Sequence, residues 1–394
     1  MKTSLSIFFA ILLLTNCTGK TTPSATREPA TVTTQPVLEE EQEPEWLIIG
    51  GQKVDNLERS RQYEHYLKSE AETITRVMLL IVVNRLPVNI DEATSLEGVE
   101  QLVNLQELTI VGWGIDELDF SPLNHLHNLN HITFSSGANA KLTKIPDLNA
   151  ITSRESITSI EFSNCALTNL NNIEFLTNLR EIEIVSNADD LTDINALRDL
   201  QHIEMLKIYS EKISIYGIKE QEFLGHIGSK PKLKKLLLSV KQVDAKVIEN
   251  FNSLEEINFL ESNVINTKYL SELRKVEYLQ MMIREPVPDI EFLKGMENLK
   301  RLVLYAPDST WGRKEDERFP VLDLGPIGNL SQLNYLELWG FILQNVAALN
   351  KLDNLEQTLF AHSVLKDSSE ISSKKLIFHP DAPNFTPVWG INEW

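Results

Sequence analysis

Pairs of apolar residues separated by a single residue return along this chain at intervals of 21 to 34 residues. The first members of ten such pairs are Leu108, Ile132, Ile160, Ile182, Leu206, Leu236, Ile257, Leu279, Leu302 and Leu336. A degenerate copy precedes them at Val77, and a ragged one follows near Leu359. Alternating apolar residues are typical of a strand with one buried face. Since one such unit cannot bury its apolar side alone, the pattern predicts short parallel strands stacked around one shared core.

The clearest unit is LTNLREIEIVSN, residues 176–187, which resembles the leucine-rich repeat L-x-x-L-x-L-x-x-[NC]-x-L. A period near 22 residues and compact phrases such as LTDINAL, residues 191–197, are similar to the short-period, internalin-like bacterial class. The resemblance implies an α/β leucine-rich-repeat solenoid, or horseshoe, over residues 76–365. Its concave face would carry a parallel sheet and its convex side mostly short 3₁₀ or extended segments. In another repeat, Cys165 stands at the position that Asn187 has in this unit, at the turn after the strand. We therefore expect Cys165 to be a buried structural residue in the row of equivalent positions rather than a nucleophile.

A solenoid needs its ends covered, and both ends of this chain carry apolar segments for that purpose. Residues 46–75 are the predicted N-terminal cap, with a hairpin around Gly50-Gly51 and a helix over 57–75. Residues 366–394 are the predicted C-terminal cap because they hold several large apolar side chains.

The longer intervals between repeats mark additions on the convex side. Residues 219–227 show helical spacing of apolar side chains, and Asp244 is placed to cap a helix over 245–251. Residues 306–320 form a charged excursion bracketed by prolines, and long loops of this kind are often functional.

The first 16 residues have the features of an export signal. One lysine precedes an apolar run over residues 6–14, which is too short to span a bilayer but suits a signal peptide. The following Leu14-Thr15-Asn16-Cys17 resembles a bacterial lipoprotein signal, which implies cleavage after residue 16 and lipid on Cys17. Asn16 departs from the small residues that this signal prefers, and plain secretion with cleavage after Gly19 is the alternative.

Residues 17–45 are rich in Thr, Pro and Glu, so we expect a lipidated cysteine followed by a disordered tether. Together these features predict an exported protein, lipid-anchored in the bacterial cell envelope at the periplasm or the cell surface. The membrane lipid would then be one of its partners.

The net charge limits the classes of partner, and the cysteine count excludes one class of fold. The chain of 394 residues has 37 Lys and Arg against 56 Asp and Glu, a net charge of −19. Binding to a phosphate backbone depends on clustered basic residues, so we expect no nucleic-acid partner. Two cysteines are too few for a disulfide scaffold.

The repeat register also predicts which side chains share the concave face. Large apolar and aromatic residues with one arginine gather on its C-terminal strands: Tyr209, Leu260, Tyr278, Met282, Arg301, Val303, Tyr305, Tyr335 and Trp339. Strands lie about 4.8 Å apart, so five of them would present a patch about 20 Å long. Such patches and such residues are typical of interfaces, and we predict that this one binds a protein or glycan partner. Alternatively, the C-terminal cap or residues 306–320 cover Tyr305, Tyr335 and Trp339, and the patch is core.

No sequence motif of a known catalytic site is present, and we predict no catalytic residue, metal or cofactor. His125, His127 and His131 are the sole histidine cluster, but the repeat register should keep their rings apart. Glu161 and Glu183 are neighbours on the acidic half of the face, yet an open face provides no cleft to raise a carboxyl pKa.

The sequence therefore favours a non-catalytic, membrane-anchored, exported binding module over an enzyme. A structural or self-assembling envelope lipoprotein is the alternative. An enzyme with an unrecognised site is the third reading.

Overall fold

The computed structural model describes residues 45–54, 65–82, 93–113, 115–136, 145, 147–151, 154–165, 167, 169–186, 193–209, 227–239, 242–249, 251–260, 262–283, 289–306, 319–366 and 376–379. All of them belong to one compact unit, Pro44–Trp394. The expected signal peptide (1–16), Cys17 and residues 18–44 lie outside the described residues. None of the helices in the described part of the chain is long and apolar enough to cross a membrane.

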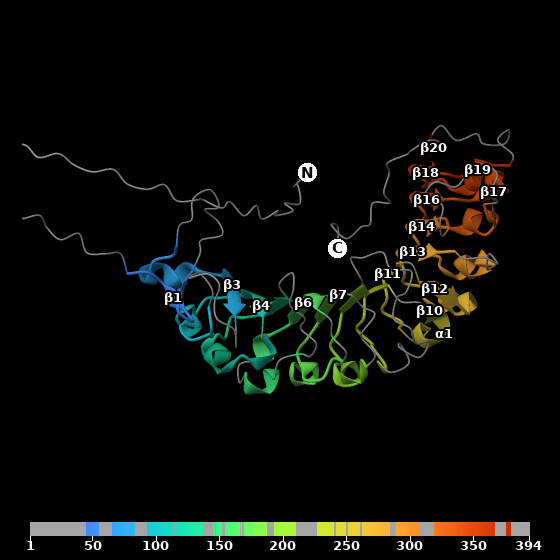
Figure 1. Cartoon of the computed structure of the whole chain (residues 1–394). Helices are drawn as coiled ribbons and strands as arrows, with labels where there is room; N and C mark the ends of the chain where they lie inside the picture. The colour runs from blue at the N-terminus through green and yellow to red at the C-terminus, as the bar shows by residue number, and fades with distance from the viewer. Residues whose placement is uncertain are drawn as a thin grey trace, which may run out of the picture. The chain divides into compact units, whose positions relative to one another are not determined.

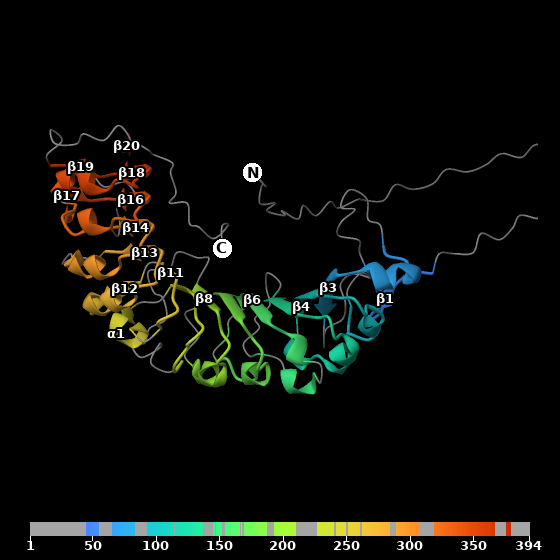
Figure 2. The same cartoon turned by 180° about the vertical axis from the view of Figure 1, so that it is seen from behind.

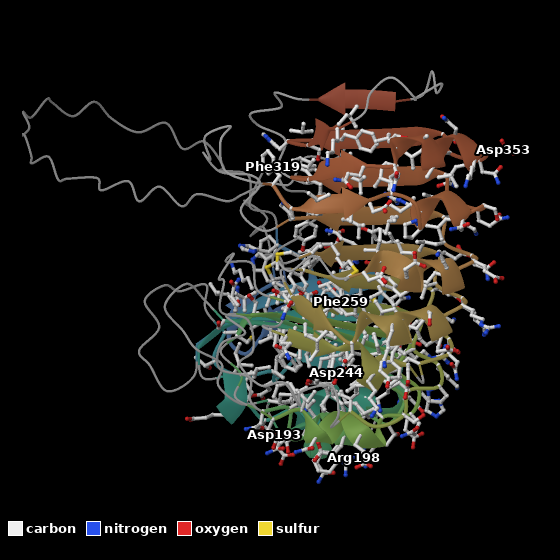
Figure 3. All side chains as sticks on the ribbon, turned by 90° about the vertical axis from the view of Figure 1, so that its right-hand side faces the viewer. Asp193, Arg198, Asp244, Phe259, Phe319 and Asp353 are labelled. Carbon is white, nitrogen blue, oxygen red and sulfur yellow. The ribbon has the colours of Figure 1, made fainter. Side chains whose placement is uncertain are left out.

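Thirteen of the described strands form one sheet in which all neighbours are parallel and follow the chain order. Its strands are β3 (Arg76–Val82), β4 (Glu107–Trp113), β5 (His131–Ser136), β6 (Ser159–Cys165), β7 (Glu181–Ser186), β8 (Met205–Tyr209), β9 (Lys235–Leu238), β11 (Glu256–Phe259), β13 (Tyr278–Met282), β14 (Arg301–Tyr305), β16 (Tyr335–Trp339), β18 (Gln357–Ala361) and β20 (Leu376–His379). Figures 1 and 2 show these strands along the inner side of the coil and short helical turns along its outer side. In Figure 3 the C-terminal strands lie one above another. This is a leucine-rich-repeat solenoid, as the sequence predicted.

The strand register confirms the predicted repeat at all ten positions. Each predicted first residue lies opposite the next: Leu108, Ile132, Ile160, Ile182, Leu206, Leu236, Ile257, Leu279, Leu302 and Leu336. Val77 pairs with Leu108 as the degenerate first copy. In the last repeat, Thr358 rather than Leu359 lies opposite Leu336. The parallel strand β20 continues the sheet beyond residue 365, where we expected the repeats to end.

One continuous core runs behind the sheet, built from the apolar pairs and from leucines of the outer turns. Aromatic side chains stack within it: the Phe134 and Phe162 ring centres lie 5.5 Å apart in a stacked arrangement. Phe120 meets Phe134 edge-on at 5.8 Å. Because consecutive repeats place equivalent side chains next to each other, the core is shared by neighbouring repeats.

Asparagines before the strands link five of the repeats to the preceding one. Their Nδ2 atoms donate to carbonyl oxygens of the preceding repeat at 2.8 to 3.1 Å, in Asn104, Asn128, Asn178, Asn298 and Asn354. These bonds satisfy carbonyl groups that the tight turns leave unpaired. Asn187, which the repeat pattern places after the strand, lies outside the described residues, and the row of asparagines before the strands was not predicted.

Cys165 is buried at the end of β6, as predicted, with its Sγ 3.3 Å from the Ser163 carbonyl oxygen. Burial raises the pKa of its thiol to about 12. Since the thiolate is the nucleophile that attacks a disulfide reagent, we expect Cys165 in a Cys17→Ala chain to react at pH 8 at least about 100-fold more slowly when folded than in urea. A chromogenic disulfide reagent measures both rates. Equal rates would show that the thiol is accessible in the folded chain.

The outer side consists mostly of 3₁₀ turns, as expected for short repeats. They are η3 (Val99–Gln101), η4 (Ile115–Glu117), η5 (Ser121–His125), η6 (Leu148–Ala150), η7 (Arg154–Ser156), η8 (Ile173–Phe175), η10 (Asn195–Asp199), η12 (Thr267–Glu272), η13 (Ile290–Gly295), η14 (Ile327–Asn329) and η15 (Val346–Lys351). Two small parallel sheets accompany them: β10 (Gln242–Asp244) with β12 (Asn263–Ile265), and β15 (Val321–Asp323) with β17 (Ile342–Gln344) and β19 (Val364–Leu365).

The helix α1 (Ala245–Ile248) begins where the sequence predicted it. Asp244 Oδ1 accepts from the Lys246 backbone N–H at 2.9 Å, which satisfies a free amide of the first turn. The helix ends at Ile248 rather than at Phe251. The helix expected within 219–227 lies outside the described residues except for residue 227, and so does most of the 306–320 excursion.

At the N-terminal end, β1 (Ile48–Ile49) and β2 (Gln52–Lys53) form the expected antiparallel hairpin. Gly50 and Gly51 turn it with φ of +55° and +87°, which favours glycine at both positions. Gly50 also donates to the Glu97 carbonyl oxygen at 2.7 Å. Within the expected helix over 57–75, the described part forms the 3₁₀ turn η2 (Lys68–Thr73) instead. The N-terminal cap over 46–75 stays a proposal, and the hydrogen bond from Gly50 to Glu97 of the first repeat supports it. Of the proposed C-terminal cap, residues 366 and 376–379 are described.

One core position of the repeat holds a lysine. The backbone carbonyl oxygen of Lys230 accepts the N–H of the residue three positions later. The carbonyl oxygens of Leu126 and Leu176 make the same bond in their repeats, so Lys230 occupies a position that holds leucine elsewhere. It is 1% exposed, and its Nζ lies 3.3 Å from the Arg198 carbonyl oxygen. Burial lowers the pKa of this amine from its ordinary value to about 8, because desolvation disfavours the charged form. A cation therefore replaces an apolar contact at the junction of β8 and β9.

Candidate functional site

The inner face of the sheet has three rows of side chains, set by the residue before each apolar pair, the residue within it and the residue after it. The strand register places Tyr278, Arg301 and Tyr335 in the first row and Val303 in the middle row. The other five predicted binding residues lie in the third row: Tyr209, Leu260, Met282, Tyr305 and Trp339. Eight of the nine therefore lie on the strands at the predicted positions, and Leu260 directly follows the last residue of β11, Phe259.

The structure buries six of these nine side chains, so the prediction that they are exposed is wrong. They are Tyr209, Leu260, Met282, Val303, Tyr305 and Trp339. Val185, Tyr209, Leu237 and Leu260 form one small cluster, and Met282, Tyr305, Trp339 and Ala361 form another. The physical reason is lateral packing: strands about 4.8 Å apart bring large side chains of the third row into contact with one another and with Leu237 of the middle row. The apolar part of the predicted patch is a second core on the inner side of the sheet.

The first row remains accessible, and three of its members stack across neighbouring strands. The Arg301 guanidinium carbon lies 5.2 Å from the ring centre of Tyr278 on β13 and 5.0 Å from that of Tyr335 on β16. Arg301 is exposed, whereas the two tyrosines are half-buried. A cation between two aromatic faces is attracted to both ring quadrupoles. These three residues are named the Tyr–Arg–Tyr stack.

Hydrogen bonds to the middle row hold both tyrosines in place. The Tyr278 hydroxyl donates to Gln280 Oε1 at 2.6 Å, and the Tyr335 hydroxyl donates to Glu337 Oε2 at 2.5 Å. The other Glu337 oxygen accepts from the Trp339 indole N–H. Burial and the bond to Glu337 raise the pKa of the Tyr335 hydroxyl above its ordinary value, so it remains a donor. The stack is therefore attached to the buried cluster beneath it.

The N-terminal half of the inner face is polar. His131, the member of the histidine cluster that faces inward, has Nδ1 2.8 Å from Ser159 Oγ and Nε2 3.0 Å from Thr133 Oγ1. Nearby, Arg76 pairs with Glu107 at 2.6 Å. A shallow depression of about 430 Å³ is lined by Arg76, Glu107, Asn130, His131, Thr158, Ser159, Arg180 and Glu181. Among the described residues, no three His, Cys, Asp or Glu side chains are grouped so as to hold a metal ion.

Glu161 and Glu183 lie opposite each other on β6 and β7, as predicted, but each is engaged by other side chains. Glu183 accepts from Lys207 Nζ at 3.1 Å and from the Tyr209 hydroxyl at 2.9 Å. Glu161 accepts from the Ser163 hydroxyl. Both carboxylates therefore act as acceptors for neighbouring donors on the inner face.

The repeat register places Gln280 and Glu337 in the middle row, but it does not by itself show their bonds to the tyrosines. The available signal was the spacing Tyr-x-Gln and Tyr-x-Glu, since residues two apart on a strand share a face. The buried Lys207 and Asn258 were likewise placed on this face without partners. Asn258 Nδ2 donates to Gln280 Oε1 at 3.2 Å and extends the polar chain by one strand.

The parallel register and the inner face define the class of the protein as a leucine-rich-repeat solenoid. No protein-family model matches the chain, and no curated protein matches its sequence. Among solved structures, an internalin of Listeria monocytogenes is 17% identical, with 81% of this chain and 91% of that chain covered and a TM-score of 0.49.

Two further solved structures are similar. A leucine-rich-repeat protein of Leptospira interrogans is 15% identical, with 78% of this chain and 93% of that chain covered and a TM-score of 0.34. The leucine-rich-repeat ectodomain of a plant membrane receptor kinase from Arabidopsis thaliana, in complex with Casparian strip integrity factor 2, is 15% identical. Here 68% of this chain and 40% of that chain are covered, with a TM-score of 0.40. These likenesses concern the repeat architecture, and the fold assignment rests on the strand register of the chain itself.

Proposed function

We propose that this chain is a non-catalytic recognition module, exported and held at a bacterial membrane by lipid on Cys17. It binds a partner, a protein or a glycan, with the inner face of its sheet. The observation that carries this proposal is the Tyr–Arg–Tyr stack, an accessible group of three residues fixed on a rigid sheet. Tyrosine and arginine are among the residues that contribute most to binding energy at interfaces.

The geometry of the inner face supports binding rather than catalysis. Glu183 and Glu337 accept hydrogen bonds from the hydroxyls of Tyr209 and Tyr335 on the same face. Rigid support of an exposed group lowers the entropic cost of holding it in one geometry on binding. The stack is therefore already held in one geometry before a partner binds, which favours a role in recognition.

Photo-crosslinking in the native cell tests this role. A benzoylphenylalanine at Gln357, an exposed first-row position beside Tyr335, is expected to form adducts with a partner. The same group at Lys268, exposed on the outer side, is the matched control and should give none. Adducts from position 268 alone, or no adduct from position 357, would contradict binding at the inner face. An adduct of two copies of the chain would support the self-assembly alternative.

A Cys17→Ala substitution is expected to abolish incorporation of labelled palmitate and to release the chain from the membrane fraction. The reason is that stable anchoring needs covalently attached acyl chains, which the variant cannot carry. Fractionation of labelled cells measures both effects. Cys165→Ala is the matched control and should keep the label, because Cys165 is buried. Retention of the label in Cys17→Ala would rule out this anchor.

A further inference from the structure

The shallow depression of about 430 Å³ on the N-terminal half of the inner face follows the starts of five neighbouring strands, β3 to β7. These strands lie side by side in Figure 1. The depression is lined by the first residue of each strand and by the residue directly before β5, β6 and β7. Because strands lie about 4.8 Å apart, it extends over about 19 Å, which suits an elongated ligand.

Among the described residues that line this depression, none has an apolar side chain. We name it the polar depression, and from the chemistry of its lining we propose that it binds a neutral oligosaccharide. This inference rests on the proposed function, since it names the ligand class for one half of the inner face. A sugar carries hydroxyl groups around its ring, and each hydroxyl both donates and accepts hydrogen bonds.

The lining offers donors and acceptors side by side. At the β7 end, the Glu181 carboxylate supplies two acceptor oxygens, and the neighbouring Arg180 guanidinium supplies a fork of donors. In the middle, the Asn130 amide and the Thr158 hydroxyl each contain a donor and an acceptor. Arg180, Glu181 and Asn130 are exposed, and Thr158 is half-buried. A row of sugar hydroxyls therefore meets a complementary group at successive strands.

Backbone hydrogen bonds fix the spacing of these groups before a ligand binds. The Thr158 N–H donates to the Asn130 carbonyl oxygen at 2.9 Å, and the Arg180 N–H donates to the Thr158 carbonyl oxygen at 2.8 Å. The Asn130 N–H donates in the same way to Gln106 at 2.9 Å. A rigid arrangement of this kind loses little conformational freedom on binding, which favours affinity.

The charge of the lining favours a neutral ligand over a charged one. Its two arginines, Arg76 and Arg180, are balanced by its two glutamates, Glu107 and Glu181. Arg76 and Glu107 pair directly at 2.6 Å. The chain as a whole has a net charge of −19, which repels polyanionic glycans such as polyuronates.

The absence of apolar side chains from the described lining separates an oligosaccharide from a peptide. A peptide bound in extended form gains specificity from pockets that hold its alternate side chains. The polar depression provides hydrogen-bonding groups in place of such pockets. A ligand that is polar along its whole length therefore fits it better than a peptide segment.

A glycan array probed with the full chain tests the inference. The array holds short neutral oligosaccharides of hexose and N-acetylhexosamine units, together with uronate and amino-sugar oligosaccharides and a set of uncharged peptides. We expect binding to the neutral oligosaccharides. The dissociation constant of the best one, measured by isothermal titration calorimetry, should rise about tenfold or more in Glu181→Leu, because hydrogen bonds to a charged group are lost.

Further variants separate hydrogen bonding from charge and from the fold. Glu181→Gln removes the charge but keeps an acceptor, so it should raise the dissociation constant less than Glu181→Leu. Asn130→Leu should raise it about threefold or more, since the lost hydrogen bonds are neutral. Arg274→Leu is the matched control, because Arg274 is exposed between η12 and β13, outside the depression, and it should leave binding unchanged. Circular dichroism confirms that each variant is folded.

Several results would overturn the inference. They are an array without Glu181-dependent binding, binding confined to uronate or amino-sugar oligosaccharides, or Glu181-dependent binding of peptides in place of saccharides. Crosslinking from position 357, on the C-terminal half of the face, does not depend on the polar depression. Adducts there without saccharide binding would leave the proposed function in place and remove this inference alone.

Discussion

Replacing Phe134 by alanine is expected to lower the free energy of unfolding by about 3–5 kcal/mol, the largest effect of any substitution considered for this chain. Phe134 is fully buried, with its ring stacked on Phe162 at 5.5 Å and meeting Phe120 edge-on at 5.8 Å. The truncation leaves a cavity shared by three consecutive repeats, which the surrounding strands cannot fill without losing register. Urea unfolding followed by circular dichroism, with linear extrapolation to water, measures the loss.

Leu80→Ala is the matched control for this substitution. Leu80 lies on β3 of the same sheet but faces the inner side and is 37% exposed. Its truncation should cost less than about 1 kcal/mol, because little apolar area is removed from contact. Equal losses in the two variants would show that Phe134 does not have the core environment described above.

A Glu183→Met substitution is expected to lower the free energy of unfolding by about 2–3 kcal/mol. The ammonium of Lys207, 3.1 Å from Glu183, would stay buried without its acid, and the Tyr209 hydroxyl would lose its acceptor. Removing one member of a buried ion pair costs about 3–5 kcal/mol. The Glu183 side chain is 22% exposed, so solvent screening places the expected loss near or below the lower end of that range.

The double variant Glu183→Met/Lys207→Met should recover most of that loss. With both charges gone, apolar side chains of similar volume fill the same space, and such replacements are often neutral or stabilising. We expect the double variant to lie within about 1 kcal/mol of the original chain by the same urea assay. A double variant as unstable as the sum of its single substitutions would show that the two charges are not coupled.

The sequence was sufficient to predict the repeat and its register, because burial alone dictates them. A strand with one dry face needs apolar residues at alternate positions, and ten consecutive pairs left no other alignment of the strands. The exception is informative. Thr358 is polar and occupies a core position opposite Leu336, so the last copy of the apolar pair is irregular and the sequence located it only near Leu359.

Which side chains of the inner face are buried and which are exposed could not be predicted from the same pattern. Alternation shows which side chains share a face, but whether neighbours cover one another depends on their sizes and conformations across several strands. Trp339 in the third row is 1% exposed for this reason, whereas Arg301 in the first row stays accessible. Likewise, the sequence put Tyr278, Arg301 and Tyr335 on adjacent strands, but their stacking depends on hydroxyl bonds to Gln280 and Glu337.

The lysine in a leucine position has a consequence for how the coil opens. Repeats contact their immediate neighbours, so the weakest junction sets where cooperative unfolding divides. Amide hydrogens of β8 and β9, on either side of Lys230, should therefore exchange with solvent earlier than those of β4 to β6. Because the Tyr–Arg–Tyr stack lies on the C-terminal side of this junction, a partner bound at the inner face there would slow exchange in β13, β14 and β16 and leave the N-terminal segment unchanged.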